Sequence, residues 1–202
     1  MLSLAVNASQ ISMIADVQHG AYGVARYAGQ RMSKEDFLHW ESDDNYIYEF
    51  NEGVLEPTTS MRQDEITLLK QLTRRFSQTA QYQQGGELIA EVDVWLTDKQ
   101  MRRPDIAYYS ADQQRQMADG SRVVPAFVIE FGSVTDTESV SVQKRHEYFD
   151  AGVQVVWWVF PLYKEVVIYR SPIDMTGRHD DDLLSAAPAL PDFQLTVAEL
   201  FG

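Results

Sequence analysis

Hydrophobic and polar residues follow two different periods along the chain, and this mixture predicts an α/β fold. Apolar residues spaced three to four positions apart predict a long helix over residues 61–81. The positions that recur there are Ile66, Leu69, Leu72, Phe76 and Ala80. Ser33 is typical of a helix N-cap and predicts a short helix that ends near residue 42. A third helix is predicted over residues 138–151, because Gly152 stands where a C-terminal glycine cap belongs.

Strand-like segments lie between the predicted helices. A hairpin is predicted from residue 46 to residue 56 around the turn Asn51-Glu52-Gly53. Strict alternation over residues 87–97 predicts one strand, whose shared face carries Leu88, Ala90, Val92, Val94 and Leu96. Further strands are predicted over residues 106–109, 127–131, 153–160 and 165–170. The resulting order of helices and strands predicts a mixed β-sheet flanked by helices.

The predicted elements begin only after the first thirty residues. Residues 1–30 show no clear periodicity and are interpreted as an N-terminal arm that only contact would order. Residues 31–202 are expected to form one domain, which agrees with a length of 202 residues. Residues 110–122 are polar and are expected to form a loop or a short helix, and the chain ends in a short amphipathic piece.

The net charge of −13 narrows the classes of function. A protein that coats nucleic acid through bulk electrostatics is disfavoured, because duplex phosphates would repel it. An enzyme that binds DNA through one local basic patch remains compatible with this charge, and so does acidity that serves solubility alone. The absence of cysteine excludes disulfides and thiolate metal sites.

The same composition bears on where the protein works. No apolar stretch is long enough to span a bilayer. A secretory signal begins with basic residues, and the first basic residue here is Arg26. A cytoplasmic protein without a membrane partner is therefore expected. A homodimer stays an open alternative.

Glu130 is the most informative single residue, because it is an acid inside an otherwise apolar predicted strand. Alternation places it on one face with Val128 and Gly132. An ionised carboxylate in such a strand is costly unless it is paired or bound to a metal. A metal site is one interpretation, and a buried salt bridge to Arg102 or Arg103 is the other.

Three more residues could complete a site around Glu130. Asp105 begins a strand that we expect to neighbour the strand of Glu130, and two such carboxylates suit Mg²⁺ or Mn²⁺. Lys144, one turn before Tyr148, could hold an attacking water or neutralise charge on a phosphate. Glu49 is a lone acid in an aromatic strand and could be a further ligand. The alternatives are a strand-entry turn at Asp105, a solvated lysine at Lys144 and a solvent-facing acid at Glu49.

Other reaction types lack their usual motifs. The four histidines are scattered, so none has zinc-ligand spacing to another. The sequence contains no glycine-rich phosphate loop and no Gly-x-Ser-x-Gly motif of serine hydrolases.

Several short motifs occur in an order and spacing that resemble the Uma-two family of restriction-endonuclease-like proteins, within the PD-(D/E)xK nuclease superfamily. They run from residue 48 almost to the end of the chain, and the resemblance covers roughly residues 32–201. The segments are YEFNEG at 48–53, RPDIA at 103–107, VIEFGS at 128–133, AGV at 151–153, WWV at 157–159, LPDF at 190–193 and ELF at 199–201.

The resemblance implies a restriction-endonuclease-like fold and a role for each candidate residue. It implies that Asp105 and Glu130 bind a divalent metal ion, Mg²⁺ or Mn²⁺. The superfamily's usual lysine falls on Gly132, and Lys144 looks like its displaced replacement. Glu49 corresponds to an auxiliary acid.

Two functions are therefore carried forward. The first is a metal-dependent endonuclease that hydrolyses phosphodiester bonds in nucleic acid, with DNA as the expected partner. The second is a non-catalytic binding or scaffold protein that keeps the nuclease fold. The second is favoured by the net charge and by two departures from the family pattern. Gln63 or Asp64 stands where the family often has histidine, and Val140 stands where it often has aspartate.

Overall fold

The structure is a computed structural model that describes residues 23–132 and 137–202 and divides into two units, Met1–Ser60 and Met61–Gly202. Each unit is described by itself. The arm expected over residues 1–30 lies for the most part, at residues 1–22, outside the described residues. No helix among the described residues is long and apolar enough to cross a membrane.

The first unit contains a short helix and a β-hairpin. Helix α2 spans Lys34–Leu38, and strands β1 and β2 span Ile47–Asn51 and Val54–Thr58. The Ser33 side chain accepts a hydrogen bond from the Asp36 N–H, so the predicted N-cap is confirmed, although the helix ends before residue 42. The predicted hairpin is also confirmed, since β1 and β2 pair antiparallel with Asn51 opposite Val54.

Residues 26–30, within the expected arm, pack against this hairpin. The Gly29 N–H donates to the Leu55 carbonyl at 2.8 Å, and the Leu55 N–H donates to the Gln30 carbonyl at 2.9 Å. The Tyr27 ring meets the rings of Trp40 and Tyr48 edge-on, with centroid distances of 5.0 and 5.9 Å. This part of the chain therefore belongs structurally to the first unit.

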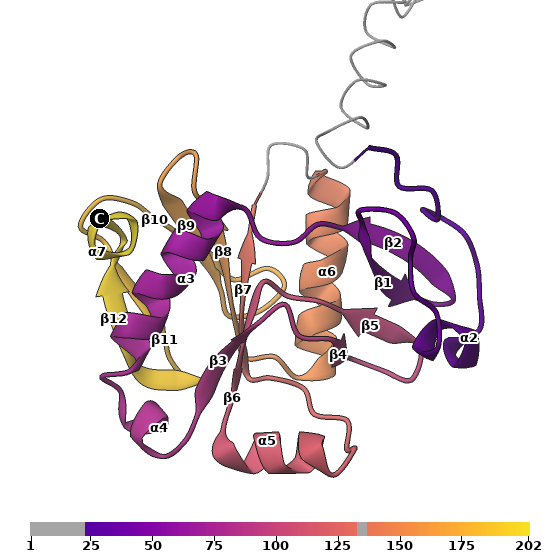
Figure 1. Cartoon of the computed structure of the whole chain (residues 1–202). Helices are drawn as coiled ribbons and strands as arrows, with labels where there is room; N and C mark the ends of the chain where they lie inside the picture. The colour runs from indigo at the N-terminus through magenta and orange to yellow at the C-terminus, as the bar shows by residue number, and fades with distance from the viewer. Residues whose placement is uncertain (1–22, 133–136) are drawn as a thin grey trace, which may run out of the picture. The chain divides into compact units, whose positions relative to one another are not determined.

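The second unit is built on a mixed six-stranded sheet (Figure 1). Its strand order is β10-β9-β8-β7-β6-β3. In chain order, these strands span Glu87–Ala90 (β3), Ile106–Tyr109 (β6), Phe127–Phe131 (β7), Val155–Phe160 (β8), Glu165–Tyr169 (β9) and Met175–Arg178 (β10). Strands β7 and β8 are parallel, and every other neighbouring pair is antiparallel. The predicted mixed sheet is confirmed.

Helices and two short hairpins complete this unit. The helices are Gln63–Phe76 (α3), Ala80–Gln83 (α4), Ala111–Ala118 (α5), Glu138–Ala151 (α6) and Val197–Phe201 (α7). The hairpins pair Val94–Trp95 (β4) with Gln100–Arg102 (β5) and Leu183–Ala186 (β11) with Leu190–Thr196 (β12). Gly152 ends α6 in the left-handed conformation, at φ 109°, so the predicted glycine cap is confirmed.

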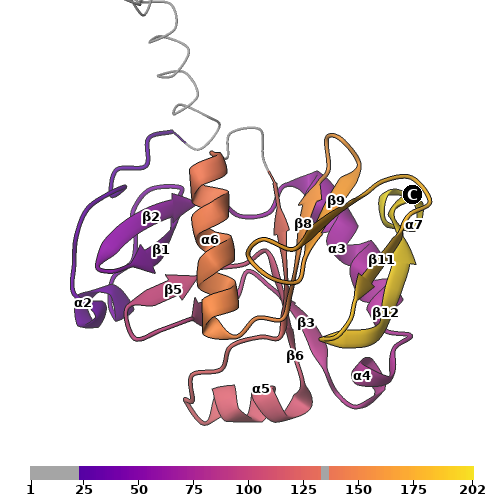
Figure 2. The same ribbon diagram turned by 180° about the vertical axis from the view of Figure 1, so that it is seen from behind.

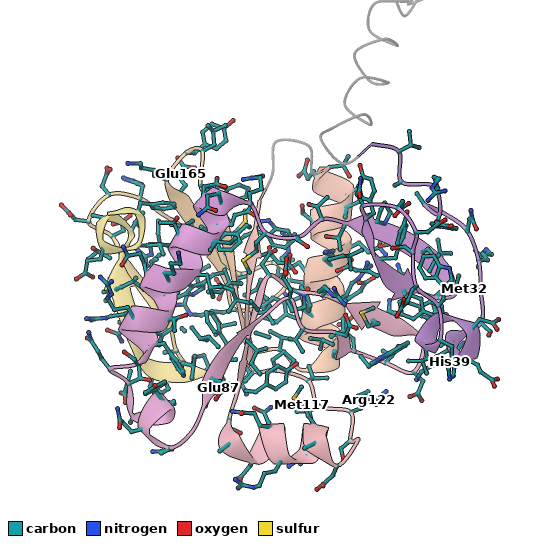
Figure 3. All side chains as sticks on the ribbon, viewed as in Figure 1. Met32, His39, Glu87, Met117, Arg122 and Glu165 are labelled. Carbon is teal, nitrogen blue, oxygen red and sulfur yellow. The ribbon has the colours of Figure 1, made fainter. Side chains whose placement is uncertain are left out.

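The sheet carries a core on each face, and these cores explain the alternation in β7. Phe127, Ile129 and Phe131 pack in the first core with α3, where the Trp157 and Phe193 rings stack at 5.5 Å. Val128 packs in the second core with Tyr148 of α6. Helices α3 and α6 therefore cover different faces of the sheet, as Figures 1 and 2 show from opposite sides. The side chains that fill the space between these helices and the sheet are drawn in Figure 3.

Two predicted elements are broken by local backbone features. The single helix over 61–81 is wrong, because α3 ends at Phe76 and a new helix starts after Thr79, whose side chain accepts from the Tyr82 N–H at 3.2 Å. The single strand over 87–97 is also wrong. Glu91 has a positive φ of 50°, and the chain changes face there. Leu88 packs in the first core, whereas Val94 and Leu96 pack in the second.

Candidate active site

Asp105 and Glu130 lie on neighbouring strands. Asp105 immediately precedes β6, and Glu130 is the fourth residue of β7. The two strands pair antiparallel with Ile106 opposite Ile129, so the next pair outward brings Asp105 opposite Glu130. The Phe131 N–H donates to Asp105 Oδ2 at 2.6 Å, which fixes the Asp105 carboxylate against the end of β7. The expectation that these strands are adjacent is confirmed.

The two carboxyls are held in surroundings that disfavour two negative charges. Glu130 is only 6% exposed, and the Tyr148 hydroxyl of α6 donates a hydrogen bond to its Oε1. Burial raises the pKa of Asp105 well above its usual range, and the negative charge of Glu130 raises it further. The Phe131 N–H and the positive charge of Lys144 act in the opposite direction on the Asp105 pKa. A pair of buried acids of this kind is suited to a cation.

Lys144 therefore belongs to the same electrostatic environment. It lies on α6, one turn before Tyr148, and its side chain is half-buried. Because its charge lowers the pKa of Asp105, the structure brings three of the four predicted site residues into one region. A cation at this place can neutralise charge that develops on a bound phosphate.

The arginines named in the salt-bridge alternative have carboxylate partners of their own. Arg102 is fully buried and pairs with Glu147 of α6, with its Nε at 2.6 Å from Oε2. Arg103 pairs with Asp93 at 2.6 Å. Glu147 and Asp93 thus each supply a negative charge to one of the two guanidinium groups.

Glu65 is a further acid near the site that the sequence analysis missed. It is 6% exposed in the first turn of α3, where it accepts the Arg62 N–H at 2.7 Å and pairs with the Arg62 guanidinium at 2.9 Å. Its negative charge also raises the pKa of Asp105. An acid in the first turn of a helix is ordinary because it complements the helix dipole, so the sequence offered no reason to single it out.

Gly132, two residues after Glu130, lies where the Phe160 ring leaves no room for a side chain. A Cβ added at Gly132 would lie 2.4 Å from Cε1 of Phe160, which is far closer than two carbon atoms can approach. The Gly132 N–H also donates to the Val159 carbonyl at 2.7 Å, so the backbone is held in place. The ring of Phe160 thus occupies the space into which a side chain at position 132 would project.

Comparisons with known proteins identify the family of the chain. A family model described as Uma2, putative restriction endonuclease, matches residues 34–198. The chain belongs to the Uma2 family. No curated protein matches it.

The fold of this Uma2 protein is also found in a solved structure. That structure is described as a putative nuclease belonging to DUF820 from Anabaena variabilis ATCC 29413. The two chains are 15% identical and superpose with a TM-score of 0.70, over 84% of this chain and 97% of the other. At this identity the likeness shows the fold, which is a restriction-endonuclease-like arrangement of mixed sheets and helices.

Glu49, the fourth predicted site residue of this Uma2 protein, lies in the first unit. It is on β1 and is 2% exposed, so it is a buried acid and does not face water as one alternative held. Its role as an auxiliary acid stays a prediction.

The side chains present fit a divalent ion bound with the help of substrate. Within residues 23–132 and 137–202, no group of three or more histidine, cysteine, aspartate or glutamate side chains could hold a metal ion by itself. Mg²⁺, however, usually takes one or two protein carboxylates and completes its shell with waters and substrate phosphate. Asp105 and Glu130 offer that donor set. The Uma2 family resembles nucleases that generally use divalent metals, and this pair is consistent with such use.

Proposed function

We propose that this Uma2 protein is a divalent-metal-dependent endonuclease that hydrolyses phosphodiester bonds in DNA. The observation that carries the proposal is the pairing of Asp105 and Glu130 on adjacent strands, where burial and mutual repulsion raise the pKa of Asp105. Such perturbed acids cluster at functional sites. Family membership supports the same class of reaction.

Each residue of the site has a distinct task in this proposal. Asp105 and Glu130 would hold Mg²⁺ or Mn²⁺, which when bound polarises a phosphate and lowers the pKa of a water molecule. The Phe131 N–H and the Tyr148 hydroxyl orient the two carboxylates. Lys144 stabilises the negative charge that builds on the phosphate during attack.

A cleavage assay tests the proposal directly. Plasmid and single-stranded DNA are incubated with the protein in Mg²⁺, in Mn²⁺ and in EDTA, and cleavage is expected only with metal. Asp105→Asn, Glu130→Gln and Lys144→Ala should each lower the cleavage rate by about 100-fold or more. Asp150→Asn removes an exposed acid from α6, the helix that carries Lys144, and should leave the cleavage rate unchanged.

Thermal melting gives an independent readout. A metal ion at a hundredfold excess over its dissociation constant should stabilise the wild type by roughly 2.7 kcal/mol, and Glu130→Gln much less. The non-catalytic alternative would be supported if the protein neither cleaved DNA nor responded to metal, and if Glu130→Gln strongly lowered its stability. The net charge of −13 is the observation that favours that alternative.

A further inference from the structure

A pocket of about 700 Å³ opens beside the proposed active site. It lies where β7 and β8 end, and these two strands are the parallel pair of the sheet. Ligands of α/β sheets bind outside the carboxyl ends of parallel strands. The first turns of α3 and the β8–β9 turn supply its other sides.

The pocket shares two elements with the acids. Gly132, which lines it, follows Glu130 by two residues, or about 7 Å along a strand. Arg62 also lines the pocket and pairs with Glu65. The negative charge of Glu65 in turn raises the pKa of Asp105. A nucleotide whose base enters the pocket would extend its phosphate toward the end of β7, where Glu130 lies.

The lining of the pocket matches the chemistry of a nucleobase. A base has two apolar faces, an edge that forms hydrogen bonds and a negatively charged phosphate attached through the sugar. Phe160, Leu162 and Tyr163 supply apolar and aromatic surface, and the last two are 71% and 64% exposed in the turn before Glu165 (labelled in Figure 3). The Thr67 hydroxyl donates to the Gln63 carbonyl at 3.0 Å, so its oxygen offers an acceptor to the edge of a base. The Arg62 guanidinium, which also pairs with Asp64 and Glu65, supplies the positive charge that meets the phosphate.

The pocket suits an unpaired base better than a duplex. Bases in a duplex are stacked, and a base enters a pocket only after it leaves the stack. Tight duplex binding also relies on many phosphate contacts, which a net charge of −13 opposes. Aromatic surface that stacks on single bases is the usual means by which proteins hold single strands.

We infer that this pocket binds one unpaired nucleobase of the substrate strand, so that the enzyme acts on single-stranded or locally unpaired DNA. The inference rests on the proposed function for the nature of the substrate. It assigns the β8–β9 turn a positioning role, since the turn holds the base while the acids act on the neighbouring phosphate.

Binding in EDTA tests the inference without cleavage. Dissociation constants are measured by fluorescence anisotropy for a labelled single-stranded 20-mer, the matched duplex and a 20-mer of the same backbone that lacks all bases. The normal single strand should bind at least tenfold more tightly than either of the others. Equal or tighter binding of the duplex, or undiminished binding without bases, would overturn the inference.

Exposed residues of the turn provide the variants. Tyr163→Ala and Leu162→Ser should each weaken single-strand binding by about tenfold, because one stacked base contributes on the order of that factor. Both residues are solvent-exposed, so the melting temperature should stay within about a degree of the wild type. Ile173→Ser changes an aliphatic residue that is 88% exposed in the following turn and should not alter binding. Unchanged binding by both pocket variants would contradict the inference.

Failure of the inference can be distinguished from failure of the proposed function. If the protein cleaves DNA with metal but the pocket variants bind single strands as tightly as the wild type, it is a nuclease without this subsite. A protein that binds single strands through the pocket, yet never cleaves them, supports the base pocket and refutes the nuclease.

Discussion

At the scale of single residues, Asp105 shows how the fold changes the chemistry of a side chain. Its pKa is raised by burial and by Glu130, so the folded protein binds the Asp105 proton more tightly than the unfolded chain does. Stability therefore falls as the pH rises above the ordinary Asp105 pKa of 3.8, and it stops falling once the pH exceeds the raised pKa. Below pH 3.8 the carboxyl is protonated in both states and this loss disappears.

The variant Asp105→Asn should remove this pH-dependent loss. Asparagine keeps an oxygen that can accept the Phe131 N–H but carries no charge. In EDTA, the melting temperature of the variant should match the wild type near pH 3.5 and exceed it once the pH rises above the ordinary Asp105 pKa of 3.8. Asp150→Asn, at an exposed position, should show no such trend. A variant that is less stable than the wild type at every pH would show that the Asp105 charge stabilises the apo fold.

Gly132 gives a second prediction at this scale. The substitution Gly132→Ala forces the new methyl group against the Phe160 ring and should cost about 1–3 kcal/mol of unfolding free energy, as overpacking does. Gly177→Ala in β10 is the matched control, because no described atom lies within 4 Å of its Cβ position. Urea denaturation measures both. A Gly132→Ala protein as stable as Gly177→Ala would mean that the Phe160 ring moves aside without cost.

At the scale of elements, the sequence predicted best where one local signal decided the outcome. The cap at Ser33 and the glycine stop at Gly152 were both correct, because capping depends on a few neighbouring atoms. The buried strands β6 and β7 were correct because their apolar runs lie wholly inside the sheet. These elements are the ones that carry or adjoin the site.

Elements that depend on distant partners were missed. Strand β10 has the sequence MTGR, which shows no apolar alternation, and it exists because β9 supplies its hydrogen bonds. The chain direction changes at Glu91, whose carboxylate accepts the Met61 N–H from 30 residues away. Asp105, Glu130 and Lys144 could be singled out from local sequence, whereas the nearness of Glu65 depends on how α3 packs against the sheet.

The link between α6 and β5 is a further prediction at this scale. Glu147 of α6 compensates the fully buried Arg102 of β5, and Glu147→Gln should cost about 3 kcal/mol, as the loss of one partner of a buried ion pair does. Asp93→Asn breaks the more exposed pair with Arg103 and should cost about 1 kcal/mol or less. Denaturant titration of the two variants measures the difference. Equal costs would show that α6 is held mainly by its apolar contacts.

At the scale of the whole molecule, the balance of charge decides how nucleic acid can be bound. The chain has 17 basic and 30 acidic residues, so a long track of phosphates meets net repulsion. Under the proposed function, a few local contacts and the proposed base pocket would supply the binding. Each phosphate contact releases counterions, so the affinity of a protein with few contacts falls much less with added salt than that of a protein that coats a duplex.

The salt dependence of single-strand binding measures the number of those contacts. With about two to three phosphates engaged, the slope of log K against log salt should be near −2, since each contact contributes roughly −0.7 for a single strand. Affinity should then fall about 16-fold between 50 and 200 mM salt, whereas a protein with six to ten contacts loses roughly 10³ to 10⁵. Arg62→Gln should make the slope shallower by about 0.7. Arg122 pairs with Asp98 and lies at the end of the second unit away from Glu165 (Figure 3). Arg122→Gln should therefore leave the slope unchanged. A slope steeper than about −4 would contradict a local site and would mean that basic residues scattered over this acidic protein form a continuous phosphate track.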